Sequence, residues 1–330
     1  MMVQLKESEH SLIRSMARSR AVWISCALVI ILYLVGSVAI PGFGQPSSML
    51  SMLVLASFTG IAAMGQNLAI LLGGIDMSIP YVITMADILI PYLGHLHMPF
   101  ILSFIIVLAI AVLVGLANGF LSAVLRLHPL IITLGLGYVV DGAMYVLTQG
   151  VPSGSAPQFL VSIVSLGSRA FGFHFPPVIL VWALLAALLI WGLRGTKWGR
   201  QIYAVGANPR AAELTLVSRV TVWSYAYVAS AVVAALAGVL LSGFSGSGYF
   251  GIGDPYLFIS VGAVAIGGSS LLGGSGSYIG TIAGVLALTE ISSMLIGFNI
   301  GSSRQEIFYG LIVLLMITFY GRDPHVKNRL

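Results

Sequence analysis

Long apolar segments, separated by short polar or glycine-rich stretches, follow one another along most of the chain. Many are close to 20 residues long, about the length of helix needed to cross ~30 Å of hydrocarbon. The pattern predicts an all-α, polytopic membrane helix bundle with about ten transmembrane helices. The predicted spans are 21–40, 50–72, 77–94, 99–123, 129–148, 176–193, 220–242, 255–270, 276–297 and 306–320.

Two of the predicted breaks between spans are very short, and the helix count depends on both. Residues 73–78 read Gly-Gly-Ile-Asp-Met-Ser, and residues 267–276 form a run dominated by Gly and Ser. One break lies in each half of the chain. Paired interruptions of this kind often flank the solute pathway of a transporter.

The composition excludes an ordinary water-soluble domain. The chain is 58% hydrophobic and only 8% charged, with a mean hydropathy of +1.03, whereas soluble domains are about 25% charged. Cys26 is the only cysteine, so no intramolecular disulfide can form, and we expect a buried thiol that acts as a small apolar group.

The basic residues predict the orientation in the membrane. If the N-terminus is cytoplasmic and the spans alternate, every one of the 15 Lys and Arg residues except Arg169 and Arg304 falls on the cytoplasmic side. Positive charge is retained on that side of membrane proteins, so both termini are predicted to be cytoplasmic. The net charge of +5 then reflects topology, and no nucleic-acid partner is expected.

The domain organisation follows from this topology. Residues 1–20 form a cytoplasmic N-terminal segment, 21–320 the transmembrane domain and 321–330 a cytoplasmic tail. The domain includes a periplasmic loop at 148–176 and a cytoplasmic loop at 194–219. The first apolar run is longer than the apolar part of a signal peptide, so we expect a membrane helix there.

No motif for catalysis is found in the chain. The Gly-rich phosphate-binding loop of ATPases is missing, as are H-E-x-x-H and C-x-x-C, so neither catalytic nor metal-binding residues are predicted. His95 and His97 are close in sequence, but we expect them in a wet external turn. An intramembrane enzyme would need a nucleophile and a base that converge, and the spacing indicates none.

Polar residues inside the predicted spans are the candidates for a solute pathway. An ionised side chain in hydrocarbon costs about 2.5–3.5 kcal/mol, so such groups usually face a bundle interior or a water-filled path. A buried structural hydrogen bond explains each residue equally well. The candidates are Gln66, Asn67, Asp76, Asp87, Asp141 and Glu290.

Two local patterns predict packing and docking. Gly115 and Gly119 lie one helical turn apart, which favours close contact with another helix, and Asn118 beside them could link helices through its amide. In the cytoplasmic loop, Asn208 followed by Pro209 is typical of a helix start. The short helix that follows could dock a partner or simply connect two spans.

Three motifs, in this order, resemble the permease subunits of bacterial ABC importers of the ribose type. Together with shorter matches they extend the resemblance over residues 50 to 320. The motifs are Gly73-Gly74-Ile75-Asp76-Met77-Ser78; Trp198-Gly199-Arg200 with Gly206-x-Asn208-x-x-Ala211-Ala212; and Ala265-Ile266-Gly267-Gly268-Ser269-Ser270-Leu271-Leu272-Gly273-Gly274-x-Gly276.

The resemblance implies the partners and the division of labour. Two permease chains, identical or paralogous, would form the path, and a periplasmic solute-binding protein would deliver the solute. A cytoplasmic ABC ATPase subunit would hold ATP and Mg, so this chain would need no cofactor of its own. Coupling to that ATPase is expected at Gly206, Asn208, Ala211, Ala212 and Glu213.

Departures from the family pattern leave the solute open. Pro80 and Leu216 stand where the family usually has Gly, and Asp141 stands where a basic residue is common. The resemblance implies a monosaccharide such as ribose, imported across the bacterial inner membrane. A nucleoside, a furanone-type signal, a passive channel and an ATP-independent secondary carrier remain alternatives.

Overall fold

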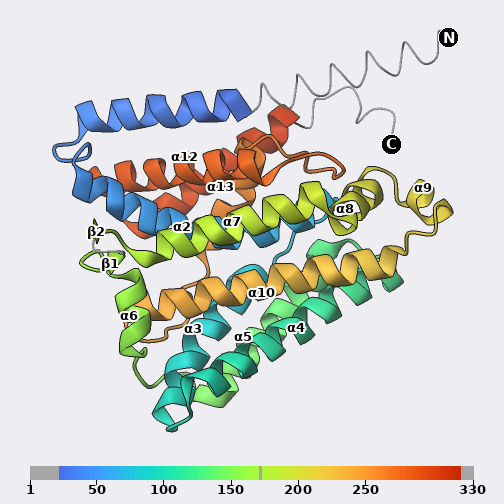
Figure 1. Ribbon diagram of the computed structural model, residues 1–330, viewed down its shortest axis with the longest axis horizontal. Helices are drawn as coiled ribbons and strands as arrows, with labels where there is room; N and C mark the ends of the chain where they lie inside the picture. Colours follow the sequence, from blue (N-terminus) through green and yellow to red (C-terminus); the bar gives the residue numbers. More distant parts are fainter. Residues whose placement is uncertain (1–21, 171–172, 321–330) are drawn as a thin grey trace.

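A computed structural model describes residues 22–170 and 173–320, so the predicted segments 1–20 and 321–330 lie outside the described residues. Long helices run side by side along the long axis of the molecule (Figure 1). After the helix Val22–Ala39, the elements are α2 (Pro46–Leu71), α3 (Ile79–His95), α4 (Phe100–Leu125), α5 (Pro129–Thr148), α6 (Gln158–Val164), β1 (Arg169–Ala170), β2 (Phe173–His174), α7 (Pro177–Gly195), α8 (Lys197–Ala207), α9 (Pro209–Leu214), α10 (Arg219–Ser245), α11 (Pro255–Ile266), α12 (Tyr278–Gly297) and α13 (Ser302–Tyr320).

The predicted fold class, a bundle of membrane-spanning helices, is confirmed. Within the described residues, seven helices are long and apolar enough to cross a bilayer: Val22–Ala39, α2, α4, α5, α7, α10 and α12. The helices α3, α11 and α13 coincide with three further predicted spans, but α3 has 17 residues and α11 only 12. The count of about ten crossings therefore stays a prediction.

Some predicted boundaries were wrong, each for a local physical reason. The span expected at 255–270 ends at Ile266, because Gly268 adopts a left-handed φ of 79° and the chain leaves the helix. The helix expected after Asn208 is present as α9: the Asn208 side chain accepts from the backbone N–H of Ala211 at 3.1 Å. A second helix, α8, precedes it and was missed.

The loop between α5 and α7 also carries structure that the sequence pattern did not predict. It contains the short helix α6 and a two-residue antiparallel hairpin, in which Arg169 pairs with His174 and Ala170 with Phe173. Beyond α7 the chain turns into the segment α8–α9, at the opposite end of the bundle (Figure 1). The two long loops thus lie at opposite ends of the helices.

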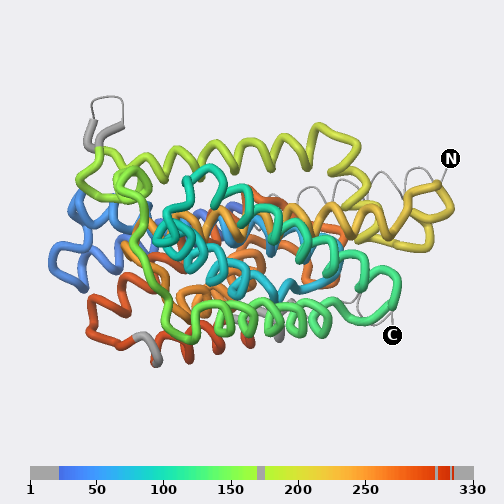
Figure 2. The backbone as a smooth tube through the Cα atoms, turned by 90° about the horizontal axis from the view of Figure 1, so that it is seen from below, coloured from blue at the N-terminus to red at the C-terminus, as the bar shows by residue number. Residues whose placement is uncertain are grey.

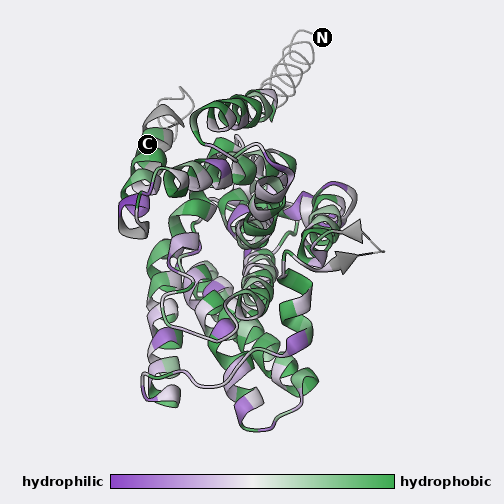
Figure 3. Cartoon of the chain, turned by 90° about the vertical axis from the view of Figure 1, so that its left-hand side faces the viewer, coloured by the Kyte–Doolittle hydropathy of each residue, from purple (hydrophilic) through white to green (hydrophobic). Residues whose placement is uncertain are grey.

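The centre of the bundle is made by α2 and α10. In each of them 61% of the most apolar window is buried, against 11% in Val22–Ala39. α10 packs against α4, α3 and α2. Large apolar side chains on the outer helices remain exposed. In the end view of Figure 3, much of the helical ribbon has the colour of hydrophobic residues. Lipid is the solvent that suits such surfaces.

The predicted small-residue contact of α4 is confirmed, and its partner is α10. A Cβ atom on Gly115 would lie 2.5 Å from Cα of Val228, and one on Gly119 would lie 2.5 Å from Cα of Ser224. No side chain fits between backbones this close. Cys26, predicted as buried, is only half-buried on the helix Val22–Ala39.

Candidate functional site

The two glycine-rich breaks, far apart in the sequence, touch each other. The backbone N–H of Gly274 donates to the carbonyl of Leu71 at 2.9 Å. A Cβ atom on Gly273 would lie 2.7 Å from the backbone nitrogen of Gly73. Both Gly73 and Gly273 have a left-handed φ, of 82° and 85°, that other residues rarely adopt. The break after α2 and the break after α11 therefore form one unit.

The end of α8 packs onto both breaks at this point. A Cβ atom on Gly206 would overlap the carbonyl oxygen of Leu71 and lie 2.8 Å from the nitrogen of Gly274. The hydroxyl of Tyr203 donates to the carbonyl of Gly276 at 2.9 Å. We call Leu71, Gly73, Gly206, Gly273 and Gly274 the glycine junction.

The remaining predicted glycines lie around this junction. A Cβ atom on Gly74 would lie 2.6 Å from the Tyr227 hydroxyl. Gly267 faces Gly280 of α12 so closely that a Cβ atom would overlap its backbone, and Gly268 supplies the left-handed turn after α11. All three motifs of the sequence thus meet in one small volume, where the chain needs its glycines for close approach.

The residues predicted to meet an ATPase divide into two groups. Gly206 and Ala212 are buried inside this chain, whereas Asn208, Ala211 and Glu213 are exposed on α8–α9. Two leucines that the sequence reasoning did not assign to a partner lie beside them: Leu214 is 87% exposed and Leu216 is 96% exposed. These two exposed leucines, at the end of α9 and just after it, form what we call the exposed tip of the cytoplasmic loop.

Asp76 lies in the first break and is completely buried. Its carboxylate accepts hydrogen bonds from the backbone N–H of Ser78 at 3.0 Å, the Ser78 hydroxyl at 2.6 Å and the Ser230 hydroxyl of α10 at 2.6 Å. Asn118 of α4 donates to the Ser78 hydroxyl at 2.8 Å, which confirms that its amide links helices. Asp76 therefore anchors the first break to the central helix.

Asn67 anchors the second break in the same manner. Its amide nitrogen donates to Thr281 of α12 at 3.0 Å and to Ser269 at 3.3 Å. Its neighbour Gln66 is fully buried, and neither polar atom of its side chain has a partner among the described residues. Asp87 accepts from the backbone N–H of Tyr249 at 3.0 Å, while its other carboxylate oxygen has no such partner.

Asp141 occupies a different environment, on a side of the molecule where several polar side chains gather. It is half-buried on α5. It lies close enough to Asp254 for the two carboxylates to repel each other, and Asp254 is repelled in the same way by Glu306 of α13. The rings of Tyr81 and Tyr138 lie beside them with centroids 5.2 Å apart, and Tyr138 is 60% exposed. We call these five residues the acidic–aromatic face.

The acidic–aromatic face could not be found from spacing along the chain. Its members come from α3, α5, α13 and the loop before α11, and only Asp141 was predicted. Seen from below, α5 and α13 run along one side of the molecule, opposite α7 (Figure 2). Glu290, the remaining predicted candidate, is buried on α12 and leaves one carboxylate oxygen without a partner among the described residues.

Comparison with known proteins identifies the class of protein to which this architecture belongs. Residues 48–320 match the family described as branched-chain amino acid transport system / permease component. No solved structure matches the chain. The chain is a multi-pass protein of the inner membrane and belongs to this family of permease components.

Similar proteins come from several bacteria. The probable ABC transporter permease protein YphD of Escherichia coli (strain K12) is 31% identical over 290 residues, 88% of this chain and 86% of that protein. The fructose import permease protein FrcC of Rhizobium meliloti is 30% identical over 312 residues, 91% and 85% of the two chains. The ribose import permease protein RbsC of Bacillus subtilis (strain 168) is 29% identical over 296 residues, 87% and 88%. The resemblance to ribose-type permeases is confirmed.

Proposed function

We propose that this chain is the permease subunit of an ATP-driven ABC importer that carries a monosaccharide, such as ribose or a related sugar. The names of the relatives support the transport class, since two of them are import permeases for fructose and ribose. The observation that carries the proposal is the glycine junction, which joins α8 directly to both helix breaks. A force that a partner outside the membrane applies to α8 would then be transmitted to both breaks.

The proposed topology has ten crossings and both termini in the cytoplasm. The described basic residues support it. Most of them lie in or beside the α8–α9 end of the bundle, which would face the cytoplasm: Arg126, Arg194, Lys197, Arg200, Arg210 and Arg219. Loop 194–219 is then cytoplasmic and loop 148–176 periplasmic. The short helices α3 and α11 complete their crossings with the adjacent glycine breaks; irregular backbone is tolerated at membrane depth where protein buries it.

In the proposed mechanism, a partner ATPase binds the exposed tip of the cytoplasmic loop. Leu214, Leu216 and Ala211 supply exposed apolar side chains, and Asn208 and Glu213 add exposed polar groups to the same segment. ATP and Mg reside on that partner, which contacts α9 and, through it, α8. Closure of the ATPase moves α8, and the glycine junction passes the movement to the ends of α2 and α11.

The acidic–aromatic face is the proposed lining of the solute path, completed by a second permease chain. Carboxylates accept hydrogen bonds from sugar hydroxyls, and tyrosine rings pack against the apolar face of a pyranose or furanose ring. Asp141, Asp254 and Glu306 provide acceptors, and Tyr81 and Tyr138 provide rings. A periplasmic solute-binding protein would release the sugar above this face, on the side of loop 148–176.

The proposal is tested by reconstitution. The permease is placed in proteoliposomes with a cognate ABC ATPase and solute-binding protein from the same organism, and uptake of radiolabelled ribose and of competing sugars is measured. Uptake should require ATP and all three components. Uptake by the permease alone, driven by a proton gradient, would replace the importer with a secondary carrier, and uptake of a nucleoside in preference to sugars would change the solute class.

A further inference from the structure

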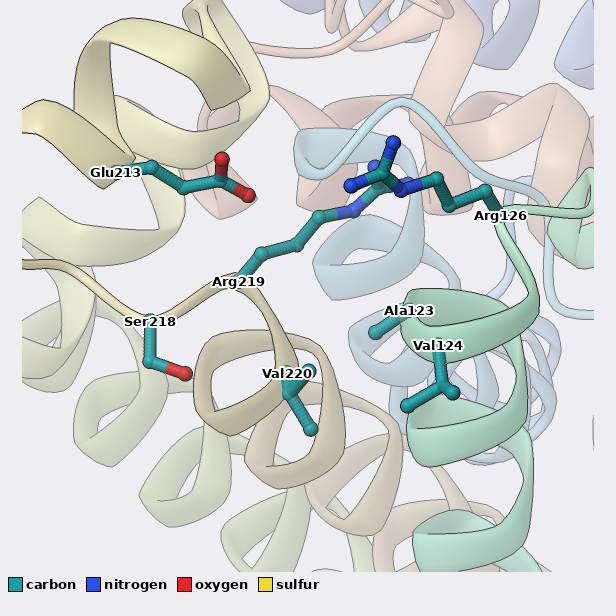
Figure 4. Close-up of a pocket in the computed structure, with 7 residues that line it drawn as sticks. All are labelled: Ala123, Val124, Arg126, Glu213, Ser218, Arg219 and Val220. Atoms are coloured by element: carbon teal, nitrogen blue, oxygen red, sulfur yellow. The ribbon is translucent and has the colours of Figure 1, made fainter.

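A pocket of about 370 Å³ opens at the α8–α9 end of the bundle, between the end of α4 and the start of α10 (Figure 4). It shares no residue with the acidic–aromatic face. The residues that line it are Ala123, Val124, Arg126, Glu213, Ser218, Arg219 and Val220.

Two arginine side chains extend into this pocket from different helices. Arg126 ends α4 in a left-handed conformation with φ 55°, and Arg219 is the first residue of α10. Figure 4 shows their guanidinium groups directed toward the same space. The Arg219 guanidinium also lies over the Trp223 ring, 5.0 Å from its centroid, which holds the side chain in place.

Neither guanidinium has a counter-ion within the part of the chain that the structure describes. The carboxylate of Glu213 points toward them in Figure 4 without forming an ion pair, and the buried Nε of Arg219 has no hydrogen-bond partner among the described residues. Two like charges that face one another repel, so an anion placed between them is stabilised by both. The planar fork of arginine fits phosphate oxygens in pairs.

An apolar track on α4 leads to this pocket. Leu113, Leu116, Phe120 and Val124 recur every three or four residues, and their side chains are 65%, 42%, 50% and 49% exposed. This spacing places them on one face of the helix, and Val124 itself lines the pocket. A charged end joined to an apolar track is the shape of a phospholipid and does not suit a free anion.

We propose that this pocket binds the phosphate group of an anionic phospholipid, held by Arg126 and Arg219, with an acyl chain along α4. In the orientation proposed above, the pocket faces the cytoplasmic leaflet, where basic pockets between helices bind anionic headgroups. A bound headgroup lies beside Glu213 and the start of α10. The lipid would therefore brace the connection between α9 and the membrane domain.

The experiment measures lipid binding to the purified full-length chain in detergent by native mass spectrometry. Phosphatidylglycerol and phosphatidylcholine with the same acyl chains are titrated separately, and inorganic phosphate is added as a competitor. Phosphatidylglycerol should bind more tightly. Arg126→Gln and Arg219→Gln should each weaken its binding about fivefold, since each basic group near the surface contributes about 1 kcal/mol.

Three further variants make the test specific. Arg219→Lys keeps the charge but loses the fork, so it should fall between the wild type and Arg219→Gln. Glu213→Gln removes the negative charge that faces the pocket and should tighten binding. Arg210→Gln, an exposed arginine of α9 that does not line the pocket, is the matched control and should change nothing.

The outcomes are decisive in both directions. Phosphatidylglycerol binding that is about fivefold weaker in each of the two pocket variants, with thermal stability unchanged and the control unaffected, supports the site. Equal binding of the two lipids, or equal loss in Arg210→Gln, overturns it. Displacement of phosphatidylglycerol by an equal concentration of inorganic phosphate would make this a soluble-anion site and overturn the lipid assignment.

Discussion

Substitution of Gly206 by Ala adds a single methyl group at the point where α8 meets both breaks. That methyl would overlap the carbonyl oxygen of Leu71 and lie 2.8 Å from the nitrogen of Gly274, whereas unbonded heavy atoms normally lie about 3.5–4.0 Å apart. Neither neighbour can yield easily, because the two atoms are hydrogen-bonded to each other at 2.9 Å. Overpacking of this kind costs about 1–3 kcal/mol.

The helix itself gains from the substitution, so any loss must come from the junction. Alanine is favoured over glycine inside a helix by about 1 kcal/mol. Gly135→Ala on α5 is the matched control, because a methyl group there meets nothing within 4 Å. We expect Gly206→Ala to lower the unfolding temperature in detergent and Gly135→Ala to leave it unchanged or raise it.

The functional readout is the ATPase activity of the reconstituted importer, stimulated by the loaded binding protein. If α8 must slide against the breaks during transport, the strain in Gly206→Ala should reduce this stimulation about fivefold or more, while the ATPase still co-purifies with the permease. Stability and stimulation equal to those of Gly135→Ala would refute the reasoning, since the junction would then tolerate a side chain and could not be the tight connection described.

Four further outcomes test the other parts of the structure. Asp76→Leu removes the acceptor of three hydrogen bonds and should cost about 1–3 kcal/mol or more of stability, measured by thermal unfolding and by the yield of folded protein. Leu214→Glu with Leu216→Glu should abolish co-purification of the ATPase without changing the unfolding temperature, because both side chains are exposed. Asp141→Leu should lower solute uptake more than it lowers protein level, since the residue is half-buried and forms no hydrogen bond within the described residues; a variant that fails to accumulate would indicate a structural role. Gly119→Val should separate α4 from α10 and destabilise the fold, seen as loss of the monodisperse peak in size-exclusion chromatography.

The sequence predicts the long helices well, because a span is a local property. Helix α5 begins at Pro129 and ends at Thr148, which are the bounds predicted for this apolar span. Helix α8 was missed, because it is amphipathic and not uniformly apolar. Its buried residues Gly199, Ile202 and Gly206 recur at helical spacing, a signal that the search for membrane spans does not detect.

The candidate sites depend on contacts between distant segments, and these were predicted only in part. The motifs around Gly73, Gly206 and Gly273 were identified one by one, but their meeting point depends on how α2, α8 and α11 pack. For Asp76 the residue type alone left a pathway and a structural bond equally open. In the structure its carboxylate accepts three hydrogen bonds, so the structural bond is present. Two of the donors belong to Ser78, two residues further along the chain.

The two anchors of the glycine breaks explain how one movement could act on both. Asp76 ties the first break to Ser230 of α10, while Asn67 of α2 ties the second break to Ser269 and to α12. Each break is thus held on one side by a buried polar group and on the other by the backbone of α8. In the mechanism proposed above, a displacement of α8 is therefore passed to the ends of α2 and α11 together, at the junction where these helices meet. A change of angle between those helices is the kind of motion that alternating access requires.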